Sequence, residues 1–212
     1  MIFYTDKVMK NVPEGVTVVA ATKYFTPEQM RELYHTGIHH FGENRVELLL
    51  EKQEALQDLD ITWHLIGTLQ TKKTKKIINS IDFLHSLDNL KLAEEINKRR
   101  LSPLPCFVQV NISNEESKHG LNETNVIDFI KSIIDFPNIQ VVGLMGMAQF
   151  TQDQSIIESE FKKINNIKNN INQELHLNLN ELSIGMSNDY LQAIKHNATY
   201  LRLGSVLFRR DE

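Results

Sequence analysis

Short apolar runs alternate with amphipathic segments along this chain, and the alternation is the first guide to its fold. Most of the runs are rich in β-branched or aromatic residues, which is typical of buried parallel strands. They cover Val16–Thr22, His39–Gly42, Ile61–Gly67, Phe83–Leu87, Cys106–Ile112, Ile139–Met147, Leu182–Met186 and Tyr200–Phe208. The segments between them repeat apolar residues at the spacing of helices that bury one face. The pattern therefore predicts about eight strands that alternate with helices.

Local signals mark where some of these helices begin and end. Thr26 can cap a helix, Pro27 suits the first helical position, and Gln29 can complete a capping box. Gly37 then predicts the end of that helix. Asn89 stands in the same way before a stripe of apolar residues and predicts a second helix start.

Eight strands that alternate with helices are the repeating units of a (β/α)8 barrel, a fold that takes roughly 200–400 residues. The chain has 212 residues. An open, doubly wound sheet is the alternative, but no Gly-x-Gly-x-x-Gly follows the first strand. No linker, low-complexity tract or shift in composition separates two domains. We therefore expect an α/β fold, a single-domain (β/α)8 TIM barrel over residues 1–212.

Composition and charge narrow the classes of function. The chain is 41% hydrophobic and 24% charged, as soluble globular proteins are, and its net charge of -4 gives no reason to expect nucleic acid as a partner. No apolar stretch approaches the ~18 residues of a membrane span, and the N-terminus lacks the pattern of a secretory signal. Cys106 lies in an apolar run and is expected to be a buried, inert thiol. The histidines lack zinc-ligand spacing, so we predict no metal, and we expect a cytoplasmic protein.

Lys23 is the first candidate for chemistry. The functional residues of such barrels lie at the carboxyl ends of the strands, and Lys23 follows the first predicted strand directly. A lysine that is desolvated there becomes a nucleophilic amine, which is what Schiff-base chemistry requires. An isolated lysine at a strand end is more often solvated, so this position alone does not decide its role.

The loops after the last two strands supply a second candidate site. Barrels commonly bind phosphate there, and Gly185, Ser187, Gly204 and Ser205 would let backbone N–H groups approach an anion closely. Arg202 would project toward the barrel centre, where its charge needs an acceptor such as a pyridine nitrogen. A serine-capped turn without phosphate and a structural ion pair for Arg202 are the alternatives.

At this point the chain resembles a known family. The motifs are Ala21-Thr22-Lys23, Phe41-Gly42-Glu43-Asn44, Trp63-His64-Leu65-Ile66-Gly67-Thr68-Leu69-Gln70, Ser117-Lys118-His119-Gly120-Leu121, Gly143-Leu144-Met145, Ser183-Ile184-Gly185-Met186-Ser187 with Asp189, and Arg202-Leu203-Gly204. In order and spacing they are similar to those of the pyridoxal phosphate homeostasis proteins, also called proline synthase co-transcribed homologues. The resemblance runs from about Val16 to Phe208.

The resemblance implies a barrel like the N-terminal domain of alanine racemase that carries pyridoxal 5′-phosphate (PLP). By position, it assigns the Schiff base to Lys23, the phosphate to Ser187, Gly204 and Ser205, the pyridine nitrogen to Arg202, and a place near the cofactor ring to Asn44. It also implies a monomer with a role in vitamin B6 and in amino-acid and keto-acid homeostasis, with little or no turnover. PLP-dependent apo enzymes would be the recipients of the cofactor.

Two other functions remain open. The first is a slow PLP-dependent amino-acid racemase or lyase, although racemisation needs a second acid or base on the opposite face of the ring. The second is a barrel that binds another phosphorylated metabolite, with Lys23 acting only as a charge. His64 lies inside an apolar run and is expected to be a hydrogen-bonded interior residue, and His119 is expected to be solvated.

The chain departs from the family pattern at a few places outside the expected Schiff-base site. Lys72 stands where asparagine is usual, Asn114 where glycine is common, and Arg209 where the family often has glycine. The segment before Val16 is short, and we expect the first helix of the family to be largely missing or degenerate there.

Overall fold

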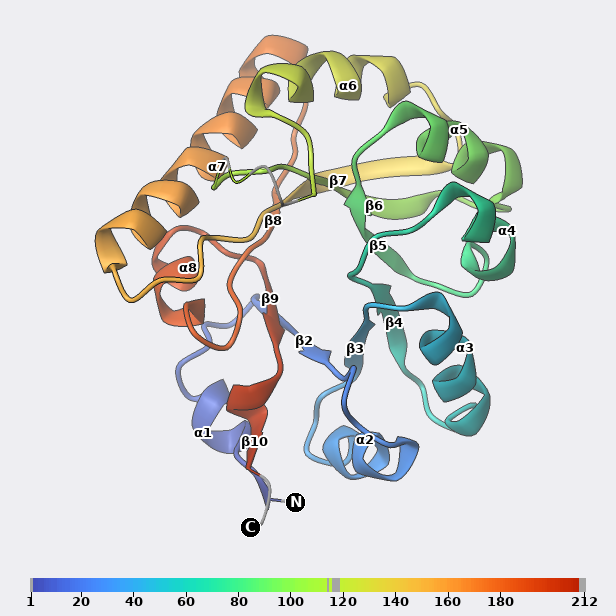
Figure 1. Cartoon of the computed structure of the whole chain (residues 1–212), viewed down its shortest axis with the longest axis vertical. Helices are drawn as coiled ribbons and strands as arrows, with labels where there is room; N and C mark the ends of the chain where they lie inside the picture. Colours follow the sequence, from blue (N-terminus) through green and yellow to red (C-terminus); the bar gives the residue numbers. More distant parts are fainter. Residues whose placement is uncertain (1, 114, 116–118, 210–212) are drawn as a thin grey trace.

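A closed barrel of parallel strands forms the centre of the protein. The computed structural model describes residues 2–113, 115 and 119–209, so that Ser117 and Lys118 of one motif, and the departure at Asn114, lie outside the described residues. In the described part of the chain, eight strands follow one another around the barrel (Figure 1). They are β2 (Thr17–Ala21), β3 (His40–Glu43), β4 (Thr62–Leu65), β5 (Phe83–Leu87), β6 (Leu104–Gln109), β7 (Ile139–Met145), β8 (Glu181–Ser183) and β9 (Tyr200–Leu203). The parallel pairing of β2 with β9 closes the ring, which confirms the predicted barrel over the open sheet.

The helices lie on the outside of this ring (Figure 1). They are α2 (Pro27–Tyr34), α3 (Val46–Ala55), α4 (Thr74–Ile77), α5 (Leu90–Arg99), α6 (Val126–Ile133), α7 (Gln154–Leu175) and α8 (Tyr190–Lys195), with short 3₁₀ turns η1 (Thr71–Lys73), η2 (Glu123–Asn125) and η3 (Ser205–Leu207). Their apolar faces pack against the barrel, where residues such as Leu33, Phe41 and Leu65 are fully buried. Among the described residues, no helix is both long and apolar enough to cross a bilayer.

The predicted helix signals act as expected. Oγ1 of Thr26 accepts the N–H of Gln29 at 3.3 Å, and Oε1 of Gln29 accepts the N–H of Thr26 at 3.0 Å, which together form the capping box. Oδ1 of Asn89 accepts the N–H of Leu92 at 2.9 Å and caps α5. Gly37 has a φ of +97°, a left-handed conformation that lets the chain leave α2.

The two ends of the chain meet in a feature that the apolar pattern did not predict. Strand β1 (Ile2–Phe3) pairs antiparallel with β10 (Phe208–Arg209), and helix α1 (Thr5–Met9) follows β1. The predicted last strand, Tyr200–Phe208, is therefore wrong in its extent, because the chain leaves the barrel at Gly204 and makes a 3₁₀ turn before β10. The first helix is short, with five residues, but it is present.

This strand pair packs near Lys23. The ring of Phe25 contacts that of Phe208 edge-on at 4.6 Å between centroids, and that of Phe3 at 6.2 Å. Both ends of the chain therefore support the loop that follows β2.

Candidate functional site

Lys23 lies in a tight turn at the carboxyl end of β2. The N–H of Thr22 donates to the carbonyl of Gly42 at 3.1 Å, and the N–H of Phe25 donates to the carbonyl of Thr22 at 2.8 Å, which fixes the backbone on both sides. The Lys23 side chain itself is exposed, and its Nζ lies 4.7 Å from the centre of the Tyr24 ring. Of the two environments that the sequence left open for Lys23, the structure shows the solvated one. An exposed amine is open to an aldehyde that arrives from solvent.

A buried ion pair between Glu43 and Lys52 holds Thr22 in this turn. Oε1 of Glu43 accepts Oγ1 of Thr22 and Nζ of Lys52, each at 2.6 Å, and Nζ of Lys52 also donates to the carbonyl of Thr22 at 2.7 Å. Side-chain exposure is 6% for Lys52 and 0% for Glu43. Sequence reasoning missed this pair. Its signal is the position of Lys52 on the face of α3 that also buries Val46 and Leu49.

The space beside Lys23 is a small cavity. It has a volume of about 230 Å³ and is lined by Lys23, Tyr24, Asn44, Arg45 and Leu48. A larger hollow of about 630 Å³ also includes Asn44, and reaches Gln70, Lys73 and His119. Asn44 therefore lines the same small cavity as Lys23, whereas Ser187, Arg202, Gly204 and Ser205 line neither cavity.

The loops after β8 and β9 form a separate group of polar contacts. Oγ of Ser187 accepts the N–H of Gly204 at 3.0 Å and the N–H of Val206 at 3.3 Å. Two backbone donors therefore converge on one oxygen atom at the start of η3, where Ser205 is exposed. Oxygen atoms of a phosphate fit the same donors, because convergent N–H groups at such a turn favour anions.

The turn in which Ser187 accepts from Gly204 and Val206 lies beside β2, the strand that leads to Lys23. A Cβ atom added to Gly204 would lie 3.5 Å from the carbonyl oxygen of Ala21, two residues before Lys23. Upstream, Gly185 has a φ of +90°, and the N–H of Met186 donates to Oδ1 of Asp189 at 2.6 Å, so the loop after β8 is also held.

Arg202 is buried at the end of the barrel that carries these loops. Its Nη1 donates to the carbonyl of Ser183 at 2.7 Å and to Oγ of Ser183 at 2.6 Å, and its Nη2 donates to the carbonyl of Gly146 at 3.0 Å. These acceptors are neutral oxygens rather than a carboxylate. Burial lowers the pKa of Arg202 to about 10, opposed by the nearby Asp189, so the guanidinium keeps its charge at neutral pH. It has five N–H groups, and further donors can face a ligand.

His64 is buried and His119 is exposed, as the sequence predicted. His64 is fully buried and lies within hydrogen-bond distance of His40 and His85, which confirms that it is a bonded interior residue. His119 is exposed, and its carbonyl accepts from Nε2 of Gln109 at 3.3 Å.

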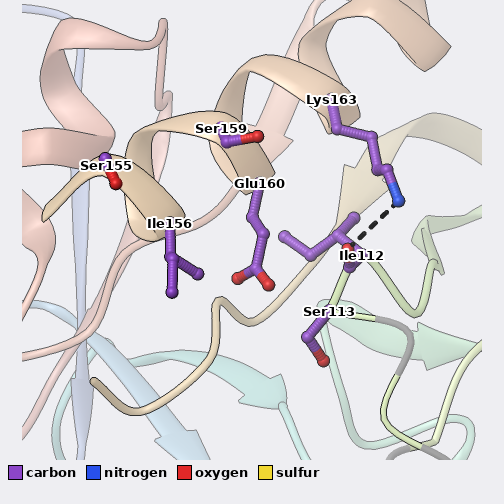
Figure 2. Close-up of a pocket in the computed structure, with 7 residues that line it drawn as sticks. All are labelled: Ile112, Ser113, Ser155, Ile156, Ser159, Glu160 and Lys163. Carbon is purple, nitrogen blue, oxygen red and sulfur yellow. Dashed lines mark hydrogen bonds between the residues drawn. The ribbon is translucent and has the colours of Figure 1, made fainter. Parts of the chain in front are cut away.

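A further hollow lies on the rim between α7 and the loop after β6. Its volume is about 410 Å³, and its lining residues are Ile112, Ser113, Ser155, Ile156, Ser159, Glu160 and Lys163. Figure 2 shows Glu160 directed from α7 toward this loop, and Nζ of Lys163 donating to the carbonyl of Ile112 at 3.4 Å. Oε2 of Glu160 accepts the N–H of Gln149 at 2.7 Å. None of the residues predicted to bind a cofactor lines this hollow.

Comparison with known proteins identifies the class. A family model described as the N-terminal domain of alanine racemase matches residues 7–211. An alanine racemase of Clostridium difficile superposes with a TM-score of 0.84 at 10% identity, over 99% of this chain and 59% of the racemase, a likeness that concerns the fold alone. The chain is thus a barrel of the alanine racemase N-terminal type.

More similar proteins define the family within that class. A pyridoxal phosphate homeostasis protein of Aquifex aeolicus is 37% identical over 194 residues, which are 90% of this chain and 85% of the relative. PipY of Synechococcus elongatus, solved with PLP bound, superposes with a TM-score of 0.90 at 30% identity, over 97% of this chain and 98% of PipY. The chain belongs to the pyridoxal phosphate homeostasis protein family, as its motifs predicted.

Proposed function

We propose that this protein binds PLP at the carboxyl end of its barrel and holds it as a Schiff base on Nζ of Lys23. The observation that carries the proposal is that two strands adjacent in the barrel end in complementary groups. Strand β2 leads to the exposed amine of Lys23, and β9 leads to the backbone N–H groups that converge on Ser187. An amine and a phosphate site side by side match the aldehyde and the phosphate of PLP.

The roles of the residues follow from their chemistry. The amine of Lys23 condenses with the aldehyde, and one water molecule is released. Ser187, Gly204 and Ser205 hold the phosphate through backbone N–H groups and hydroxyls. Asn44, which shares the small cavity with Lys23, lies beside the cofactor ring.

Arg202 favours storage of the cofactor over catalysis. Bound PLP supplies an electron sink for amino-acid chemistry, and that sink is strongest when the pyridine nitrogen is protonated. With a pKa of about 10, Arg202 stays charged and can only donate a hydrogen bond to that nitrogen, which disfavours its protonation. We therefore propose a PLP carrier in vitamin B6 and amino-acid and keto-acid homeostasis, with little or no turnover, that passes PLP to apo enzymes. The monomeric state and the cytoplasmic location stay predictions.

The first experiment is the absorption spectrum of the protein with PLP, for wild type, Lys23→Ala and the control Lys75→Ala, which removes an exposed lysine of α4. We expect a Schiff-base band in wild type and the control and none in Lys23→Ala. Borohydride reduction and mass spectrometry should place the adduct on Lys23. No band in wild type would refute PLP binding, and a band in Lys23→Ala would refute Lys23 as its anchor.

Turnover is tested separately. The loaded protein is incubated with each common amino acid in deuterated water, and exchange of the α-proton is followed by NMR. We expect no exchange above that of free PLP. Exchange with any amino acid that Lys23→Ala abolishes would establish a slow racemase or lyase instead of a carrier.

A further inference from the structure

The interior of the barrel holds a continuous line of hydrogen-bonded side chains. Nδ1 of His85 lies 2.8 Å from Oγ of Ser183, and Nε2 of His85 lies 2.9 Å from Nδ1 of His64. Nε2 of His64 lies 2.9 Å from Nδ1 of His40. Strands β5 and β8 are not neighbours, so His85 and Ser183 can meet only through the interior of the barrel. We call His85, His64 and His40 the histidine row.

The histidine row connects the two ends of the barrel. Ser183 is the last residue of β8, and its Oγ accepts a hydrogen bond from Nη1 of Arg202, the residue assigned to the proposed cofactor site. His40 is the first residue of β3 and is half-buried. Because the strands are parallel, first residues lie at the end opposite to Lys23. The row therefore links Arg202 to the far end of the barrel.

Counting donors and acceptors gives the row a single polarity. Arg202 can only donate, so Oγ of Ser183 accepts from it, and the serine hydrogen can donate to Nδ1 of His85. A neutral His85 then carries its hydrogen on Nε2 and donates to His64, which donates in turn from Nε2 to His40. In the opposite polarity His85 would donate to Ser183, and the serine hydroxyl would lose the acceptor that it has here.

The surroundings keep the rings neutral and fixed. His64 and His85 are fully buried, and burial lowers the pKa of both well below the usual value. Phe83 stacks on His64 with 4.6 Å between centroids, and Phe107 stacks on His85 at 4.4 Å. The described residues contain no group of three or more histidine, cysteine or acidic side chains arranged to hold a metal ion.

We propose that the histidine row is a set of positioning residues for Arg202. By accepting the hydrogen of Ser183, the row keeps the lone pairs of that hydroxyl turned toward the guanidinium. Arg202 is then locked between Ser183 and Gly146, with its remaining N–H groups aimed at the pyridine nitrogen of PLP. The identity of that ring rests on the proposed function, whereas the row itself belongs to the protein without cofactor.

The first test therefore uses cofactor-free protein. Histidine is labelled with ¹⁵N, and the tautomers are read from two-bond ¹H–¹⁵N correlations at pH 7, with His64→Gln and His85→Asn used for assignment. We expect His85 and His64 to be neutral, with the hydrogen on Nε2. A hydrogen on Nδ1 of His85, or a charged His85, would overturn the proposed polarity.

The second test asks whether the row controls Arg202. His85→Leu removes the acceptor of the Ser183 hydrogen, His85→Asn keeps one, and His35→Asn is the control at an exposed histidine of the surface. Rotation of the Arg202 guanidinium is measured by NMR of its Nη groups, and PLP affinity by titration. For His85→Leu we expect rotation at least tenfold faster and a Kd for PLP about tenfold higher, as for the loss of a hydrogen bond to a charged group. His85→Asn should restore both values to near wild type.

Ser183→Ala provides an independent variant if His85→Leu does not fold. It deletes the link itself and should speed up guanidinium rotation by the same factor. Rotation unchanged in Ser183→Ala, or in a folded His85→Leu, would refute the positioning role. If wild type does not bind PLP at all, the proposed function fails, while the tautomers and the rotation rates still decide whether the row positions Arg202.

Discussion

Replacing Lys52 by methionine should destabilise the protein strongly, because it leaves the carboxylate of Glu43 buried without its cation. In the structure Lys52 donates to Oε1 of Glu43 and to the carbonyl of Thr22, and both side chains are buried. Oε2 of Glu43 has no hydrogen-bond partner among the described residues, so after the substitution Oγ1 of Thr22 is the donor that remains for this carboxylate. Removal of one partner of a buried ion pair costs about 3–5 kcal/mol.

The free energy of unfolding is measured by urea titration at pH 7, followed by the fluorescence of Trp63, whose ring contacts that of Phe41 on β3. We expect Lys52→Met to lose about 4 kcal/mol. Adding Glu43→Gln removes the unpaired charge and keeps an acceptor for Thr22, so the double variant should regain about half of that loss. Lys73→Met is the control, because Lys73 pairs with Glu47 at the surface, and its midpoint should not change.

Two results would refute this reasoning. The first is a loss below about 1 kcal/mol for Lys52→Met, which is the range of exposed pairs. The second is a double variant no more stable than the single one. Because Lys52 also holds the carbonyl of Thr22, Lys52→Met should weaken PLP binding at Lys23 even where the protein is still folded.

Three further predictions concern the histidine row, Ser187 and Cys106. Since burial lowers the pKa of His64 and His85, the unfolded chain binds protons that the folded protein does not, and stability falls as the pH drops below about 6.5. The free energy of unfolding, measured by urea titration, should therefore decrease between pH 7.5 and pH 5.5. A His64→Gln/His85→Asn variant with the same pH dependence as wild type would contradict this. Ser187→Ala should raise the Kd for PLP about tenfold in equilibrium dialysis, because a charge-assisted contact is lost. The control Ser159→Ala, in the hollow of Figure 2, should not change the Kd. Equal affinities of the two variants would argue against phosphate at Ser187. The Cys106 thiol is buried, and burial raises its pKa. Iodoacetamide should therefore alkylate it in urea but not in the native protein, as measured by mass spectrometry. Rapid labelling of the native protein would refute its burial.

Most of the barrel could be predicted from the sequence because its strands are buried on both faces. Such strands appear as continuous apolar runs, and the helices between them carry local caps such as Thr26 and Asn89. The position of Lys23 at a strand end follows from the same pattern. Its environment does not, because exposure of the amine depends on how Tyr24 and the neighbouring loops pack.

The features that were missed depend on contacts between different strands and helices, which no single segment of the sequence shows. The partner of Glu43 is Lys52 on a neighbouring helix, and the partner of Ser183 is His85, 98 positions earlier in the chain. Strand β1 is too short to show an alternating pattern, and it becomes a strand only because β10 is beside it. The secondary-structure propensity of a short segment does not depend on such pairs, because they form only when the whole barrel has folded.

The pairing of β1 with β10 also makes the chain close to circular. Ile2 lies opposite Arg209, so a linker of a few residues could join the two ends (Figure 1). The chain could then be reopened at an exposed loop such as that of Leu101, which is 86% exposed and lies between α5 and β6. In such a permuted protein the barrel would keep its strand order, while the loop of Lys23 would be supported by a covalent connection in addition to the pairing of β1 with β10.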